Sequence, residues 1–144
     1  MTSEGHWHSA VVYQVYWRSF KDGNGDGIGD LKGLRSKIGY LSSLGVDAIW
    51  LNPTYPSPQG DHGYDVSNYF DVDPLFGTLE ELEQAIDEFH DHGMAVLLDI
   101  VPNHVSSQHP WFISAKEGGH GHEAESRFII LSLIHISEPT RLRS

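Results

Sequence analysis

Three short apolar runs mark out the chain at wide intervals. They cover residues 10–17, 46–51 and 95–101, and together they are rich in Val, Ile, Leu and aromatic residues. Their apolarity is nearly continuous, whereas a strand with one wet face alternates apolar and polar positions. The pattern therefore predicts three strands buried on both faces, as in a parallel sheet.

A segment with helical periodicity follows the first run. Its apolar residues recur at spacings of three and four from Leu31 to Leu44. Asp30 stands where a helix N-cap is expected, and Gly45 stands where helices commonly end. One helix is predicted between these two residues.

A second helical segment precedes the third run. Its apolar stripe extends from Leu79 to Phe89. Thr78 and Glu81 have the T-x-x-E spacing of a capping box, and Gly93 follows the end of the stripe. This segment is predicted to be the second helix.

The order of these elements is strand, helix, strand, helix, strand, which is typical of a parallel α/β fold. Long connections at 18–30 and 52–77 follow the first two strands. A doubly wound dinucleotide-binding sheet would carry G-x-G-x-x-G in the first of them, and the glycines at 23, 25, 27 and 29 do not give that spacing. The predicted fold class is therefore the N-terminal part of a (β/α)₈ TIM barrel, with about three strands and two helices.

A complete barrel takes roughly 250 residues, so the chain of 144 residues is expected to be a fragment truncated before the barrel closes. Its end, "LSLIHISEPTRLRS" at 131–144, breaks with the preceding composition. That stretch resembles the in-frame translation of a transposase-type sequencing-library adapter and is expected to be non-native. The alternative is a genuine amphipathic tail.

Composition restricts the partners and the location. The chain has 20 Asp and Glu against 9 Lys and Arg, a net charge of -11, which disfavours nucleic acid and anionic membrane surfaces. It has no cysteine, and the opening "MTSEGHWHSA" lacks an apolar leader. The apolar runs are too short to span a bilayer. A soluble, cytoplasmic protein is predicted, and the oligomeric state is left open.

The first loop reads "DGNGDGIGD" at 22–30 and has the ligand spacing of a calcium loop. Such a loop places oxygen ligands at positions 1, 3, 5, 7 and 9, the seventh being a backbone carbonyl. A structural Ca²⁺, or with less support Mg²⁺, is therefore predicted. The alternative is a flexible Gly/Asp turn capped by its last residue. The predicted ligands are Asp22, Asn24, Asp26, the carbonyl of Ile28, and Asp30.

The second loop combines aromatic rings with acids, and the third offers an acid, an amide and a histidine. Tyr64 and Asp65 lie among further aromatic and acidic residues, a mixture that suits a carbohydrate and equally occurs in loops that are merely packed. Asp99, Asn103 and His104 cluster at the end of the third run, where a barrel displays its functional groups. A lone His after a strand is more often structural, so the three loops together carry the prediction.

Three blocks resemble the alpha-amylase superfamily, glycoside hydrolase family 13, and most of all its oligo-1,6-glucosidase and alpha-glucosidase branch. They are "VVYQVYWRSFKDGNGDGIGDLKGL", "GYDVSNYFDVDPLFGT" and "LLDIVPNHVSSQHPWF". The resemblance implies a retaining glycosidase acting on oligosaccharides, with Tyr64, Asp65 and His104 contacting the sugar. It also implies that residues 1–110 belong to the catalytic barrel, and that 111–130 begin a domain inserted after the third strand.

The resemblance places the catalytic Asp and Glu after later strands, so no catalytic residue is expected within these residues and the fragment is predicted to be inactive. Three alternatives stay open. One is a transglycosylating relative, such as a trehalose synthase or sucrose isomerase. The others are a non-catalytic relative of the transporter heavy-chain kind and a calcium-dependent sugar-binding module.

Overall fold

The computed structural model describes residues 6–118 and 126–128. The chain divides into two compact units, residues 1–106 and 107–144. The stretch 131–144, predicted to be non-native, lies outside the described residues, as does part of the segment predicted to begin an inserted domain. Within the described ranges, no helix is long and apolar enough to cross a membrane.

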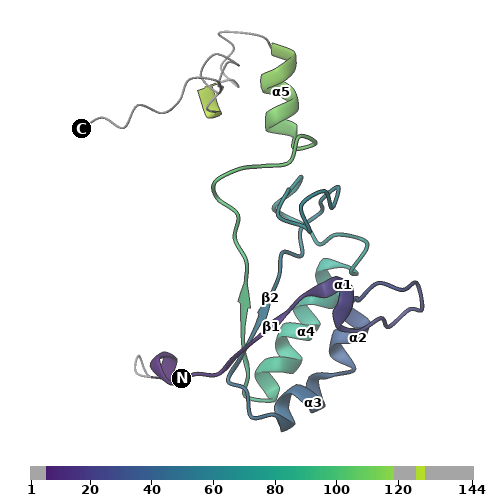
Figure 1. Ribbon diagram of the computed structural model, residues 1–144, viewed down its shortest axis with the longest axis vertical. Helices are drawn as coiled ribbons and strands as arrows, with labels where there is room; N and C mark the ends of the chain where they lie inside the picture. Colours follow the sequence, from purple (N-terminus) through teal and green to yellow (C-terminus); the bar gives the residue numbers. More distant parts are fainter. Residues whose placement is uncertain (1–5, 119–125, 129–144) are drawn as a thin grey trace, which may run out of the picture. The chain divides into compact units, whose positions relative to one another are not determined.

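The first unit contains a three-stranded parallel sheet (Figure 1). Its strands are β1 (Val12–Val15), β2 (Ala48–Leu51) and β3 (Ala95–Leu98), with β2 in the centre. The register aligns the last residues of all three strands, so the carboxyl ends lie along one edge. The three predicted strands are confirmed, although each is shorter than its apolar run.

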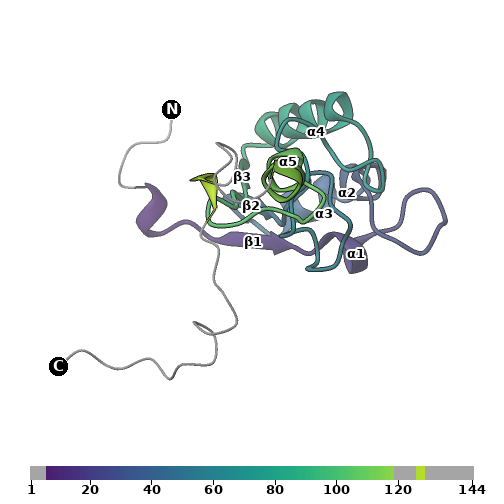
Figure 2. The same cartoon turned by 90° about the horizontal axis from the view of Figure 1, so that it is seen from above.

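Three helices cover one face of this sheet (Figure 2). They are α2 (Leu31–Arg35), α3 (Ile38–Ser43) and α4 (Leu79–Asp91). The core between helices and sheet has three groups of buried residues: Val15, Ile49 and Leu51 from the strands, Leu31, Leu34, Ile38 and Leu41 from α2 and α3, and Leu82, Ala85 and Phe89 from α4.

The prediction that all three strands are buried on both faces is wrong for the outer two. On β2, Ala48, Ile49 and Leu51 are fully buried. On β3, by contrast, Leu97 and Leu98 are 38% and 46% exposed, because helices cover only one face and β3 lies at the edge of the described sheet. The continuous apolar sequence of β3 therefore includes side chains that the described residues do not cover.

The single helix predicted after the first loop is two short helices. The break lies at Ser36 and Lys37, between α2 and α3. There the Ser36 hydroxyl donates to the carbonyl of Gly33 at 2.6 Å, and Lys37 N–H donates to Leu34 O at 2.9 Å, a tighter i→i−3 bond. Side-chain hydrogen bonds of this kind bend helices. Gly45, with a φ of +73°, ends α3 as predicted.

The predicted boundaries of α4 are confirmed. Thr78 Oγ1 accepts from Glu81 N–H at 3.2 Å, and the Glu81 carboxylate accepts from Thr78 N–H at 2.9 Å, so the capping box is complete. Gly93 has a φ of +76°, in the left-handed region that favours glycine after a helix.

Two helical segments beside this sheet were not predicted: the 3₁₀ turn η1 (His6–His8) and the short helix α1 (Trp17–Phe20). Trp17 was expected in the first strand. It begins α1 instead, where its indole N–H donates to Asn52 O at 2.8 Å and its ring stacks on Phe76.

The second unit contains α5 (Pro110–Gly118). Trp111 of this helix is 52% exposed, and the guanidinium of Arg127 lies 5.1 Å from its ring centroid.

The capping box makes a stability prediction. Replacing an N-cap Thr by Ala costs about 1 kcal/mol, so we expect Thr78→Ala to speed amide exchange in α4 about 5-fold. Hydrogen–deuterium exchange of peptides covering Leu79–Asp91, in the complete protein that carries this chain, measures the effect. Thr78→Ser keeps the hydroxyl and should exchange like the wild type. Equal exchange in all three proteins would show that the cap does not stabilise α4.

Candidate functional site

The loops that leave the carboxyl ends of the strands form the candidate site. Residues 52–77 follow β2, and residues 99–106 follow β3. The two loops are connected to each other and to the sheet by side chains, beginning with Gln14 of β1, whose amide donates to Asn52 Oδ1 at 2.9 Å.

Asp99 joins β2, β3 and the second loop. Its Oδ1 accepts from the indole N–H of Trp50, and its Oδ2 accepts from the hydroxyl of Tyr64, both at 2.7 Å. Its backbone carbonyl accepts from the Tyr55 hydroxyl at 2.9 Å. Because both carboxylate oxygens are occupied by donors, Asp99 is suited to fixing the Tyr64 ring rather than to binding a ligand.

Tyr64 is correspondingly hard to ionise. Burial and the neighbouring Asp99 carboxylate raise the pKa of Tyr64 to about 12, with a smaller effect from Asp61. The phenol is therefore protonated at neutral pH and presents an apolar ring with a fixed orientation. The backbone carbonyl of Tyr64 accepts from Nε2 of His104 at 3.0 Å, which brings two of the three predicted sugar contacts together.

Asp65, the third predicted contact, points into its own loop. Its Oδ1 accepts from the Ser57 hydroxyl at 2.7 Å and from Asp61 N–H at 3.1 Å, and its Oδ2 accepts from Gly60 N–H at 2.9 Å. Burial raises the pKa of Asp65, but these hydrogen bonds outweigh that effect and lower it. The carboxylate is ionised and holds the loop in shape. Its contact with a sugar stays a prediction that this geometry does not favour.

Asp61 is the acid that the loop displays. Residues 61–64 form a tight turn closed by Tyr64 N–H donating to Asp61 O at 3.0 Å, with φ of +54° at His62 and +95° at Gly63. Asp61 is exposed, and within the described ranges no hydrogen bond to its carboxylate is observed. The sequence does not single out Asp61, because four acids share this loop and only the fold shows which carboxylates already accept hydrogen bonds.

His104 is exposed, with one ring nitrogen available. Since a carbonyl can only accept, Nε2 carries the proton that it donates to Tyr64 O, and Nδ1 is left for a ligand. The site thus offers a half-buried aromatic ring together with an exposed carboxylate and an imidazole nitrogen. Together they can pack against one face of a sugar and exchange hydrogen bonds with its hydroxyls.

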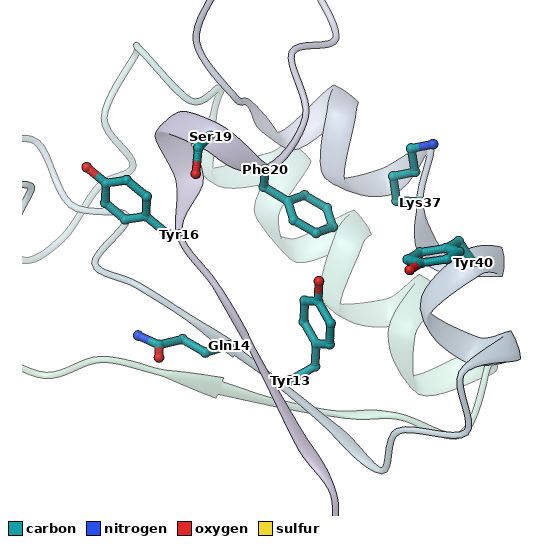
Figure 3. Close-up of a pocket in the computed structure, with 7 residues that line it drawn as sticks. All are labelled: Tyr13, Gln14, Tyr16, Ser19, Phe20, Lys37 and Tyr40. Carbon is teal, nitrogen blue, oxygen red and sulfur yellow. The ribbon is translucent and has the colours of Figure 1, made fainter.

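A pocket of about 490 Å³ lies elsewhere, along β1 (Figure 3). Tyr13, Phe20, Lys37 and Tyr40 line one side of it, and Gln14, Tyr16 and Ser19 complete the lining. None of the predicted site residues contributes to it. We therefore place the candidate site at the loops, where the polar network converges, and not in this pocket.

The predicted calcium loop is ordered by its own side chains. Asp22 Oδ1 accepts from the N–H groups of Asn24 and Gly25 at 3.0 and 2.6 Å, and Oδ2 accepts from Gly27 N–H at 2.8 Å. These backbone hydrogen bonds, that of Gly25 first, lower the pKa of Asp22. Asp26 Oδ1 accepts from Ile28 N–H in the same way.

The glycines of this loop are needed for two different reasons. Gly25 and Gly27 have φ of +90° and +89°, which other residues rarely adopt. Gly29 instead approaches the backbone of α1, since a Cβ there would lie 1.8 Å from Trp17 O. The alternation of glycine with polar residues thus reflects both tight turns and close packing.

The loop at 22–30 fits a bound metal ion only in part. Asp22, Asn24 and Asp26 offer hard oxygen atoms on one ordered loop, which suits Ca²⁺. However, Asp30 accepts from Gly33 and Gly23 N–H with its two oxygens, confirming its role as N-cap. In the part of the chain that is described, no three His, Cys, Asp or Glu side chains are grouped closely enough to hold a metal. A cation would need the Asn24 amide and the Ile28 carbonyl as well.

Comparison with known proteins identifies the class. The family profile "Alpha amylase, catalytic domain" matches residues 14–139. The chain therefore belongs to the alpha-amylase catalytic-domain family, which confirms the resemblance to glycoside hydrolase family 13.

Among curated relatives, the chain is 53% identical over 110 residues to a probable alpha-glucosidase of Rhizobium meliloti, covering 76% of this chain and 20% of that protein. It is 50% identical over 111 residues to the oligo-1,6-glucosidase of Heyndrickxia coagulans, covering 77% of this chain and 20% of that protein. The chain thus spans about a fifth of the length of these relatives.

Solved structures confirm the fold. The trehalulose synthase MutB from Pseudomonas mesoacidophila MX-45 matches with a TM-score of 0.84 and 47% identity, covering 89% of this chain and 23% of that one. The family match and this similarity together establish that the sheet and its helices are the N-terminal part of a (β/α)₈ barrel.

The Asp99–Tyr64 contact makes a prediction about ionisation. In the complete protein, Asp99→Asn removes the charge that opposes ionisation, so the pKa of Tyr64 should fall below about 12 while burial keeps it above the ordinary value near 10. Absorbance titration at 295 nm, with Tyr64→Phe to assign the transition, measures this shift. Trp50→Phe keeps the Asp99 charge and should leave the pKa raised.

Because the pKa of Tyr64 is raised by folding, the stability of the folded protein depends on pH. The stability that Tyr64 contributes is fully present below the unfolded pKa near 10 and is lost as the pH rises through about 12. An unchanged pKa in Asp99→Asn would show that the carboxylate does not act on the phenol.

Proposed function

We propose that the complete protein carrying this chain is a retaining alpha-glucosidase that releases glucose from the ends of maltose- or isomaltose-type oligosaccharides. The observation that carries the proposal is the turn at 61–64, which presents the Asp61 carboxylate beside a Tyr64 ring fixed by Asp99. The names of the relatives, alpha-glucosidase and oligo-1,6-glucosidase, support it. We also propose that the protein is located in the cytoplasm.

Each group of the site has a separate task in this proposal. The Tyr64 ring packs against the C–H face of the terminal glucose, while Asp61 accepts hydrogen bonds from its hydroxyls. His104 adds a bond through Nδ1, and Asp65 keeps the turn in place. Retaining chemistry needs two carboxyl groups about 5–5.5 Å apart. The resemblance assigns them to later strands, so neither Asp65 nor Asp99 is asked to be the nucleophile.

A second candidate is a glucosyl-transferring or isomerising enzyme acting on sucrose. It is favoured by the structural similarity to the trehalulose synthase MutB, of which one structure holds the substrate sucrose. The two candidates share the glucose site and differ in the acceptor, which is water in a hydrolase and a sugar hydroxyl in the alternative.

The complete protein should distinguish the candidates directly. We expect release of glucose from maltose or isomaltose, with the α-anomer appearing first in a proton NMR time course because the mechanism retains configuration. Conversion of sucrose to an isomer without net hydrolysis would favour the second candidate. If neither maltose, isomaltose nor sucrose reacts, the proposal of a glucosidase is wrong.

The assignment of Asp61 is tested by two matched variants of the complete protein. Asp61→Asn should lower kcat/KM about 100-fold, because a charged hydrogen bond to the substrate is weakened in the transition state, and should leave the melting temperature unchanged. Asp65→Asn should lower the melting temperature, because the carboxylate loses acceptor capacity for the loop. A reversed pattern would return the sugar contact to Asp65.

We further propose that the loop at 22–30 binds a structural Ca²⁺ through the side chains of Asp22, Asn24, Asp26 and Asp30 and the carbonyl of Ile28. The support is the oxygen-rich, preordered loop and its ligand spacing. When bound, the cation would offset the repulsion among the acids of the loop, whose positions next to α2 suit a role in stability.

Calcium binding should raise the melting temperature of the complete protein. At a Ca²⁺ concentration 100 times the Kd the stabilisation is about 2.7 kcal/mol, and EDTA should reverse it. Asp26→Asn should reduce the shift, whereas Asp87→Asn, which removes an exposed charge on α4, should not. An identical melting temperature in EDTA, Ca²⁺ and Mg²⁺ would favour a metal-free Gly/Asp turn.

A further inference from the structure

The turn that carries Asp61 is tied to the first strand by a contact that the proposed function does not use. Tyr16 directly follows β1, and its hydroxyl lies 2.8 Å from Nδ1 of His62. The two rings meet edge to face, with centroids 5.9 Å apart and planes at 61°. In Figure 3 the Tyr16 hydroxyl points away from Tyr13 and Tyr40, so the contact belongs to the loop side of β1.

The turn at 61–64 has a histidine, His62, at a position with positive φ. Positive φ at both central residues, His62 and Gly63, is typical of a type I′ turn, in which Asn-Gly is the common pair. A residue other than glycine is uncommon at positive φ, although histidine is found there more often than most. Such a conformation persists where the surrounding structure enforces it, and here the His62 ring reaches Tyr16.

The turn is held from two sides. Asp65 accepts from the N–H groups of Gly60 and Asp61, which fixes the start of the turn. The Tyr16–His62 contact joins the middle of the turn to the residue that directly follows β1. Asp61 lies between these two anchors, and its carboxylate has no observed partner of its own in the described ranges, so its direction depends on them.

We propose that Tyr16 and His62 are positioning residues, whose hydrogen bond directs the Asp61 carboxylate toward the bound glucose. The inference rests on the proposed function of Asp61. The bond forms whether the hydroxyl donates to an unprotonated Nδ1 or Nδ1–H donates to the hydroxyl oxygen. Its loss leaves the turn folded through Asp65 and lets Asp61 move away from the sugar.

The test measures the inhibition constant for glucose, and kcat and KM for maltose, in the complete protein. Tyr16→Phe removes only the hydroxyl, and His62→Gly removes the ring while keeping the positive φ favourable. Each should weaken glucose binding about 5-fold, the worth of one hydrogen bond. The double variant should be no worse than either single one, because both remove the same contact.

Two controls separate positioning from general stability. His62→Asn tolerates the turn and places an amide where Nδ1 was, so it should restore glucose binding to within about 2-fold of the wild type. Tyr40→Phe removes the hydroxyl of an exposed tyrosine on α3 and should change nothing. If His62→Gly does not fold, Tyr16→Phe, which keeps its ring, decides the question.

The outcomes distinguish this inference from the proposed function. If Asp61→Asn weakens glucose binding while Tyr16→Phe does not, or if the two changes in the double variant add, the positioning role is wrong and the glucosidase stands. If the wild-type protein neither binds glucose nor cleaves a glucoside, both are overturned.

Discussion

The Asp99 carboxylate is the interaction on which the rest of the site depends. It lies at the end of β3 and accepts from Trp50 of β2 and from Tyr64 of the long second loop. Buried apolar residues such as Val66, Val72 and Phe76 anchor parts of this loop, and charge-assisted hydrogen bonds to the strand end fix the position of Tyr64 within it. Through this one carboxylate, the rigidity of the parallel sheet reaches the aromatic ring that we assign to the sugar.

The acidity of the chain has a structural meaning as well as a chemical one. Asp22, Asp30 and Asp65 each accept from several backbone N–H groups, and Asp73 does the same for Leu75 and Ser57. Loops without regular secondary structure leave such donors unpaired, and a carboxylate satisfies two or three of them at once. Most acids of the loops are therefore engaged in holding the backbone. Asp61 is informative because no donor to its carboxylate is observed among the described residues.

The sheet of the described residues leaves apolar surface uncovered. Helices protect one face, and in this three-stranded sheet only β2 has a neighbour on each side, so apolar residues of β3 are exposed along the edge. A barrel solves this by closing the sheet on itself. The site also depends on barrel closure. The loops at the ends of these three strands are only part of the circle of loops that surrounds the site of a complete barrel.

The sequence by itself determined the elements that depend on neighbours along the chain. The apolar runs located the three strands, the Thr78–Glu81 box and Gly93 located α4, and the spacing of Asp30 located the start of α2, because periodicity and capping are local. It did not reveal the break at Ser36, a local competition between side chain and backbone. Only the tertiary structure decided which acid of the second loop is available. Asp65 and Asp61 are the same residue type in the same loop. They differ because, among the described residues, three donors point at the Asp65 carboxylate and none is observed at that of Asp61.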